Sequence, residues 1–133
     1  MSCLAERLGA PFVVAGALRD AGAVAAFLVE RDRDVLGLAA GEQDAGGRPQ
    51  PALEDWLGAG VILSELPTDL LAPAARAAGA FRSARADLNA RLAWSTSGRE
   101  LRGREFAGDV RLTAELNAGA VVPLLVDGVF GAL

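Results

Sequence analysis

The stretch PFVVAGALRDAGAVAAFLVERDRDVLGLAAGE, residues 11–42, decides the fold that the sequence predicts. Residues 11–16 form a short apolar run with β-branched side chains, which is typical of a buried strand. A helix from about residue 21 to residue 31 is expected next, because small apolar residues recur there at helical spacing. These residues are Ala21, Val24, Ala25 and Leu28. Residues 35–40 have the pattern of a second buried strand, so the order strand, helix, strand predicts a parallel βαβ unit with a right-handed crossover.

The rest of the chain predicts further helices and a C-terminal hairpin. The helices are expected at about 51–65, 73–94, 97–104 and 108–116. Ser97 and Glu100 have the spacing of a capping box at the start of one of them. The dipeptide Asp127-Gly128 is a turn signal between two short strands, and Pro123 cannot donate to a ladder, which favours an edge position or a bulge. The predicted class is α/β: one domain over residues 1–133, layered α/β/α around a mostly parallel or mixed sheet.

Composition limits the kind of partner. The chain has 133 residues, and 52% of them are hydrophobic, which is enough for the core of one domain. The formal net charge is −4, without the basic face that phosphate backbones require, so nucleic acid is not an expected partner. Cys3 is the only cysteine, which fits a reducing compartment. The uncharged run from Leu8 to Leu18 is too short to cross a bilayer, so we expect a cytoplasmic protein without a membrane partner.

The segment GEQDAGGRPQPALEDWLGAG, residues 41–60, holds the acids that are candidates for a site. Glu42 follows the second predicted strand, at the kind of edge where α/β sheets bind ligands. Glu54 and Asp55 fall in or near the first turn of the next helix. Carboxylate oxygens suit Mg²⁺, and such a site needs no histidine, which this chain lacks. The structural explanation stays open as well, because a helix dipole stabilises acids in its first turn by about 0.3–1 kcal/mol and loop acids are commonly solvated.

Two glycines and one arginine also have two explanations each. Gly58 and Gly60 lie inside a predicted helix, where each glycine costs roughly 1 kcal/mol relative to alanine. Either close packing or the approach of a ligand can compensate, and we favour packing. Arg19 directly precedes the first predicted helix, where its guanidinium can grip a carboxylate, sulfonate or phosphate with two hydrogen bonds. The other explanation for Arg19 is a surface ion pair with Asp20 or Glu42.

Six segments, taken in order, are similar to the 2-phosphosulfolactate phosphatase family. They are VVAGALRDAGAVAAFL (13–28), LAAGE (38–42), RPQPALEDWLGAGVIL (48–63), TSGREL (96–101), FAGDVRLTAELN (106–117) and VVPLLVDGVF (121–130). An ordered set that spans most of the chain is far more specific than any one of its members. The resemblance implies Mg²⁺-dependent hydrolysis of 2-phosphosulfolactate to sulfolactate and phosphate, a step toward coenzyme M.

The resemblance also implies roles for individual residues. Glu42 and Asp55 become the expected catalytic carboxylates, and Glu54 joins them as a ligand of Mg²⁺. The residues expected to hold the small anionic phosphorylated substrate are Arg19, Asp20, Arg48, Gly58 and Gly60. The attacking group is either an activated water or an aspartate from another part of the family sequence.

The chain departs from the family pattern at two points. Asp20 stands where the family carries asparagine, which places a negative charge close to the expected anion. Relatives also carry a long region before the matching segments, so we expect the family's N-terminal strands to be absent. A second hypothesis follows: a non-catalytic remnant that binds a ligand or forms a homo-oligomer through exposed strand edges. A third is a small α/β domain whose acids and glycines are wholly structural.

Overall fold

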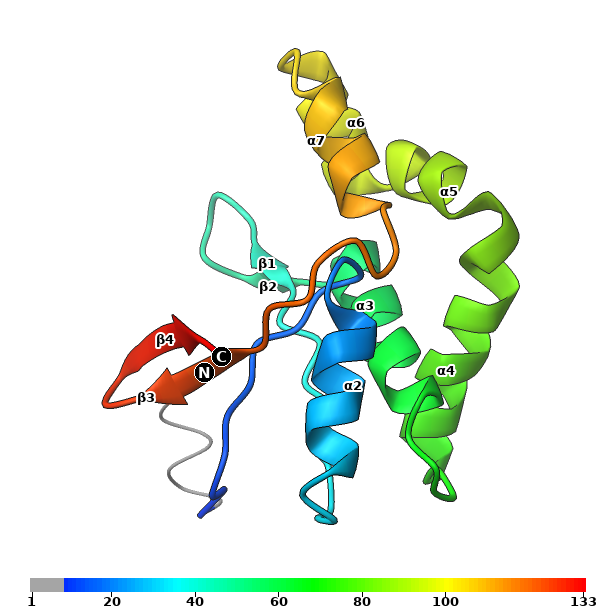
Figure 1. The fold of residues 1–133 in the computed structure, drawn as a ribbon. Helices are drawn as coiled ribbons and strands as arrows, with labels where there is room; N and C mark the ends of the chain where they lie inside the picture. Colours follow the sequence, from blue (N-terminus) through cyan, green and yellow to red (C-terminus); the bar gives the residue numbers. More distant parts are fainter. Residues whose placement is uncertain (1–8) are drawn as a thin grey trace.

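The computed structural model describes residues 9–133, so Cys3 and the start of the run from Leu8 to Leu18 lie outside the described residues. The chain forms helices and two short hairpins (Figure 1). The helices are α2 (Ala21–Val29), α3 (Leu53–Ser64), α4 (Ala72–Ala84), α5 (Leu88–Trp94), α6 (Thr96–Gly103) and α7 (Ala107–Thr113), with a 3₁₀ turn at Arg85–Asp87. The strands are β1 (Glu42–Gln43), β2 (Pro49–Gln50), β3 (Pro123–Val126) and β4 (Val129–Ala132).

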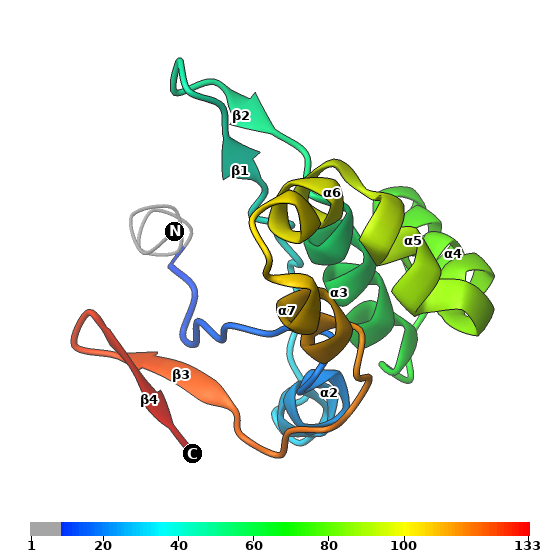
Figure 2. The same cartoon turned by 90° about the horizontal axis from the view of Figure 1, so that it is seen from above.

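Helix α3 lies at the centre of the core, with α2 on one side and α4 on the other (Figure 2). Leu57 and Val61 are one helical turn apart on α3, and both side chains are almost fully buried. They belong to a cluster that joins α3, α4, α5 and α7 to the start of α2. Its buried members are Leu18, Ala21, Leu57, Val61, Phe81, Ala84, Leu88, Leu92 and Val110.

Of the two glycines of α3, Gly60 permits a close helix contact. A Cβ at Gly60 would clash with the main-chain carbonyl of Ala77 on α4 and would lie 3.2 Å from the Cβ of Phe81. A Cβ at Gly58 would lie 3.7 Å from the nitrogen of Leu18. Both glycines are buried by protein atoms. Packing requires glycine at position 60, whereas the 3.7 Å contact at position 58 is an ordinary van der Waals distance.

The predicted strand 11–16 pairs with the end of the chain. Val14 forms an antiparallel bridge with Leu124, through the bonds from Ala15 N to Pro123 O (3.0 Å) and from Leu125 N to Val13 O (2.9 Å). Figure 1 shows the two segments next to each other where they pair: the N-terminal one is blue and the C-terminal one is orange. Residues 13–15 are thereby held by β3.

The predicted parallel sheet is not present among residues 9–133. Both hairpins are antiparallel, and residues 35–40 form no strand. A strand exists only where a partner supplies hydrogen bonds, and residues 11–16 take theirs from β3 instead of from 35–40. The α/β class is confirmed as a mixture of helices and small antiparallel sheets, and the helix expected at 21–31 is confirmed as α2.

Other local predictions had mixed outcomes. The terminal hairpin is confirmed: Asp127 and Gly128 both have positive φ (50° and 81°), as a type I′ turn requires, and Pro123 is the first residue of its strand. The single helix expected at 73–94 is wrong, because the 3₁₀ turn divides it into α4 and α5. The cap of α6 is not Ser97 but Ser95, whose hydroxyl accepts a hydrogen bond from Gly98 N.

In the part of the chain that the structure covers, residues 9–133, no helix has the length and apolar character that a membrane crossing requires.

The contact at Gly60 generates a stability prediction. We expect Gly60→Ala to lower the free energy of unfolding by about 1–3 kcal/mol, because the new methyl group forces α3 away from the main chain of α4. This loss outweighs the gain of about 1 kcal/mol that alanine brings to a helix interior. Urea unfolding followed by circular dichroism measures the change.

Gly108→Ala in α7 is the matched control, because a Cβ there meets no atom within 4 Å. It should leave the stability unchanged or raise it. Equal stability of the two variants would contradict the close packing of α3 on α4.

Candidate functional site

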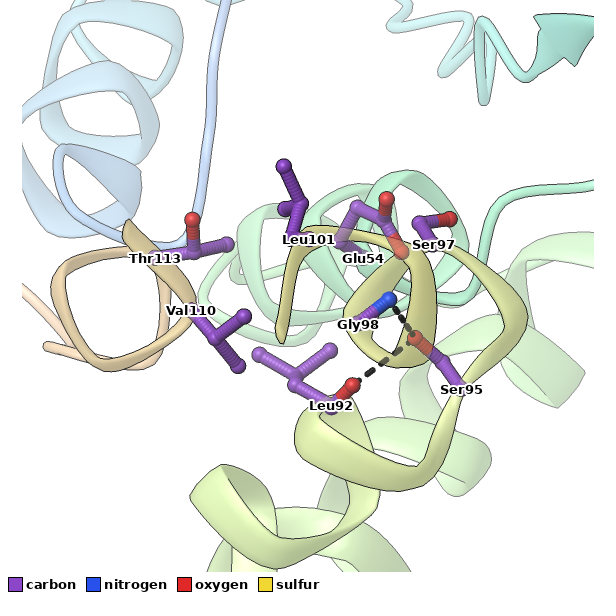
Figure 3. A pocket seen from close by; sticks show the side chains of 8 residues that line it. All are labelled: Glu54, Leu92, Ser95, Ser97, Gly98, Leu101, Val110 and Thr113. Atoms are coloured by element: carbon purple, nitrogen blue, oxygen red, sulfur yellow. Dashed lines mark hydrogen bonds between the residues drawn. The ribbon is translucent and has the colours of Figure 1, made fainter. Parts of the chain in front are cut away.

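Residues from three parts of the chain meet at the first turn of α3. We call this place the acidic junction and define it by Gly41, Glu42, Glu54, Asp55 and Ser97. Asp55 Oδ2 accepts a hydrogen bond from Gly41 N at 2.7 Å, and Glu42 Oε1 accepts one from Ser97 Oγ at 3.1 Å. Glu54 and Ser97 line one small cavity (Figure 3). Asp55 is thus tied to the residue before β1, Glu42 is tied to α6, and Glu54 lines the cavity beside Ser97.

The local sequence explains why Asp55 reaches Gly41. The N-cap residue of α3 is Ala52, which has no side-chain acceptor for the helix N–H groups. Glu54 and Asp55 supply negative charge in the first turn, where the helix dipole favours it. Gly41 has a φ of +69°, and a Cβ there would lie 2.6 Å from Gln50 O, so only glycine fits. The chain therefore turns tightly at Gly41 into β1, and the Gly41 N–H is directed at Asp55.

A second glycine positions Ser97. Ser95 Oγ accepts from Gly98 N at 3.0 Å and donates to Leu92 O at 2.8 Å, which joins the start of α6 to the end of α5. A Cβ at Gly98 would clash with Leu92 O, so α6 can begin here only with glycine at that position. With Ser95 as the cap, the Ser97 hydroxyl is free to donate to Glu42. The spacing of Ser97 and Glu100 predicts a capping box, so this role of Ser97 is not evident from the sequence.

The cavity beside Ser97 is small and largely apolar. Its volume is about 50 Å³, which suits one or two water molecules and not a phosphorylated acid. Glu54, Ser97 and Thr113 form a polar part of its wall, and the remaining lining residues are Leu92, Ser95, Gly98, Leu101 and Val110. Figure 3 shows Glu54 and Ser97 together on one side of it. A substrate at the junction would therefore lie outside this cavity, next to Glu42.

A larger hollow adjoins the junction at Gly41. Its volume is about 360 Å³, within the range of small-molecule sites. The lining residues are Ala39, Ala40, Gly41, Pro49, Gln50, Pro51, Ala52 and Trp56. Among them, Gln50 and the indole of Trp56 offer side-chain hydrogen-bonding groups, so the hollow suits the uncharged part of a ligand.

The predicted three-carboxylate metal set is not assembled. Within residues 9–133, no three His, Cys, Asp or Glu side chains are grouped so that they could hold a metal ion. Asp55 is engaged with Gly41, whereas Glu42 and Glu54 both approach Ser97. Two carboxylates still fit Mg²⁺, because this ion commonly takes one or two protein carboxylates and completes its shell with water and substrate phosphate.

The two predicted substrate-binding arginines are engaged elsewhere. The Arg19 guanidinium donates to the Glu115 carboxylate and, at 3.0 Å, to the main-chain oxygen of Leu112 at the end of α7. An ion pair was one of its two expected explanations, but the partner is Glu115 and not Asp20 or Glu42. Arg48 pairs with Asp44 within the turn between β1 and β2, at 3.0 Å. Neither arginine has a hydrogen bond to a carboxylate of the junction among the described residues.

Asp20 also has a local structural role. Its Oδ1 accepts a hydrogen bond from Ala17 N at 2.7 Å, just before α2. The structure thus uses Asp20 to turn the chain into the helix. It shows no contact of Asp20 with the junction among residues 9–133.

Asp44 is held as the anion in the β1–β2 turn. Its carboxylate accepts from the main-chain N–H groups of Arg48 and Gly46, each at 2.9 Å. The Arg48 N–H is the largest cause that lowers the pKa of Asp44 below its ordinary value of 3.8, and the Arg48 guanidinium adds to this effect. The turn therefore depends on the ionised form of Asp44.

This pKa shift predicts a pH-dependent turn. Since the folded-state pKa of Asp44 is depressed, its stabilisation is fully present above the ordinary value of 3.8 and is lost as the pH falls through the folded pKa. Carbon NMR should show the Asp44 carboxyl titrating below 3.8, with the Gly46 and Arg48 amide signals moving in step. The Asp44→Asn variant should abolish that step, and an ordinary titration of Asp44 would contradict the arrangement.

The bond from Gly41 to Asp55 predicts a second measurable effect. Asp55→Ala should lower the free energy of unfolding by about 1–2 kcal/mol and speed hydrogen exchange at the Gly41 amide, because that N–H loses its acceptor. Asp55→Asn keeps an acceptor oxygen and should retain most of the protection. Unchanged exchange at Gly41 in the alanine variant would show that the bond does not hold β1.

Comparison with known proteins identifies a family whose match covers nearly the whole chain. The family model described as 2-phosphosulpholactate phosphatase matches residues 2–128. A search of curated proteins gives no match. Since the family match spans nearly the entire sequence, the chain belongs to the 2-phosphosulpholactate phosphatase family.

Proposed function

We propose that this chain is a phosphomonoester hydrolase that acts on a small 2-phospho acid such as 2-phosphosulfolactate, at the acidic junction. One observation carries the proposal. Three of the family-like segments, 38–42, 48–63 and 96–101, meet at the hydrogen bonds of Glu42 and Asp55, although the last of them is more than 30 residues from the other two. Packing alone does not require Glu42 and Glu54, from two different segments, to lie beside Ser97 of the third.

Glu42 has the best placement for proton transfer. It is exposed to solvent, and Ser97 orients its carboxylate by a hydrogen bond. In that position Glu42 can accept the proton of a water molecule that attacks phosphorus, which is the role of a general base. Asp55 acts through the main chain: by binding Gly41 N, it fixes the residue that precedes Glu42.

Glu42 and Glu54 are the residues that would hold Mg²⁺. Bound there, the ion would neutralise charge on the phosphoryl oxygens of the substrate. The N-terminus of α6 offers main-chain N–H donors to the same phosphate.

A second candidate function is ligand binding without turnover. Two observations favour it: the described residues assemble no three-ligand metal group, and the cavity beside Ser97 holds only about 50 Å³. In this case the junction and the adjoining hollow of about 360 Å³ would bind the phospho acid but leave it intact.

The decisive experiment measures phosphate release from 2-phosphosulfolactate and related 2-phospho acids, with and without Mg²⁺. We expect Glu42→Gln to lower kcat/KM by about 100-fold or more, because a general base contributes roughly that factor. Glu65→Gln is the matched control, since Glu65 is exposed at the opposite end of α3. Full activity of a Glu42→Ala, Asp55→Ala double variant would remove the site from the reaction.

Metal binding has its own readout. Mg²⁺ should raise the melting temperature of the chain, and Glu54→Gln should abolish the increase even if no substrate is turned over. Binding of the phospho acid, measured by calorimetry without any phosphate release, would establish the second candidate in place of the first.

A further inference from the structure

The larger hollow lies beside the carboxylate that the proposed function uses. Gln50 lines the hollow, and in the antiparallel pair of β1 and β2 it is the direct partner of Glu42. Opposed residues of such a pair carry their side chains on the same face, with Cβ atoms about 4.5–5.5 Å apart. Gly41, the residue before Glu42, lines the hollow as well. A ligand whose phosphate lies at Glu42 therefore has the hollow within reach of its other atoms.

The wall of this hollow carries no charge. Within residues 9–133 it is lined by alanines, prolines, a glycine, Gln50 and Trp56, none of which ionises. The neighbouring cation along the chain is Arg48, and its guanidinium is paired with Asp44 at 3.0 Å. An anionic group placed in the hollow would lose water without gaining a counter-charge, whereas an apolar group gains free energy by leaving water. The hollow therefore disfavours a second anionic group of the ligand.

Trp56 gives the hollow an apolar wall with the size of an aromatic ring. Its main-chain N–H bonds to Ala52 O at 3.1 Å, so its position is fixed by the first turn of α3. The indole is nevertheless 40% exposed, although the next residue, Leu57, is almost fully buried. An exposed indole beside the rings of Pro49 and Pro51 is a surface on which an aryl group packs. The volume of about 360 Å³ has room for such a group.

We propose that this hollow binds the group on carbon 3 of the 2-phospho acid, and that this group is uncharged and apolar, such as phenyl. The inference rests on the proposed function, because it takes the substrate phosphate to lie at Glu42. Two compounds that differ only in this group are 2-phospho-3-phenyllactate and 2-phosphosulfolactate. The first places a ring against Trp56, and the second places a sulfonate against the uncharged wall.

Tryptophan fluorescence measures this preference directly. The chain has two tryptophans, and Trp94 is 70% exposed on α5 and does not line the hollow. In a Trp94→Phe variant the emission therefore reports on Trp56 alone. Titrated without Mg²⁺, so that binding is separated from hydrolysis, 2-phospho-3-phenyllactate should bind about tenfold or more tightly than 2-phosphosulfolactate. It should also shift the emission to shorter wavelengths, because the indole loses water. Equal or tighter binding of the sulfonate compound would overturn the proposal.

Variants of Trp56 test the wall itself. Calorimetry should show that Trp56→Ala lowers the affinity for 2-phospho-3-phenyllactate by about tenfold, so that the preference disappears. Trp56→Phe keeps an aromatic ring and should keep most of the preference. Trp94→Ala is the matched control outside the hollow and should keep all of it. A preference that survives Trp56→Ala, in a variant whose circular dichroism shows intact helices, would overturn the proposal.

Phosphate release separates this inference from the proposed function. If both compounds are hydrolysed with Mg²⁺ and the sulfonate compound has the higher kcat/KM, the proposed function stands and the apolar subsite is overturned. If neither compound releases phosphate but the phenyl compound binds at Trp56 with the expected preference, the apolar subsite is supported and ligand binding without turnover replaces hydrolysis.

Discussion

The close approach of α3 and α4 is the constraint on which the rest of the structure depends. Gly60 lets the main chain of α4 lie directly against α3, and Leu57 and Val61 fill the core on either side of this contact. The remaining elements are arranged around α3: α2 packs on one side, and the segment before β1 rests on Leu63. Because α3 is held along its length, its first turn has a fixed place, and the acids in that turn have fixed neighbours.

The acidic junction follows from this fixed helix end. The dipole of α3 favours the negative charge of Glu54 and Asp55, and the absence of a capping side chain at Ala52 leaves Asp55 to bind Gly41. On the other side, the Ser95 cap of α6 frees the Ser97 hydroxyl for Glu42. Gly41 and Gly98, where a Cβ would clash with a main-chain oxygen, make these approaches feasible. The match to the 2-phosphosulpholactate phosphatase family is the reason for proposing a function at this place.

The sequence predicted the local elements better than their partners. Helical spacing located α2, and Asp127-Gly128 located the terminal hairpin, because each signal lies within a few residues. The acids of the first turn of α3 were also identified. The pairing of residues 11–16 was wrong, and so was the uninterrupted helix at 73–94. For Arg19 the expected ion-pair partners were two nearby acids, whereas Glu115 approaches it only after α7 has packed.

By itself, then, the sequence determined which segments are helical, where the chain turns, and which carboxylates carry negative charge at a helix start. These properties depend on periodicity, on turn residues and on the local dipole, all of which act between neighbours in the chain. Only the tertiary structure decided that residues 11–16 pair with β3, that Gly60 packs against the main chain of α4, and that Ser97 donates a hydrogen bond to Glu42. The physical reason is that a main-chain or side-chain hydrogen bond across many residues needs both partners in place, and only the packed helices provide that geometry.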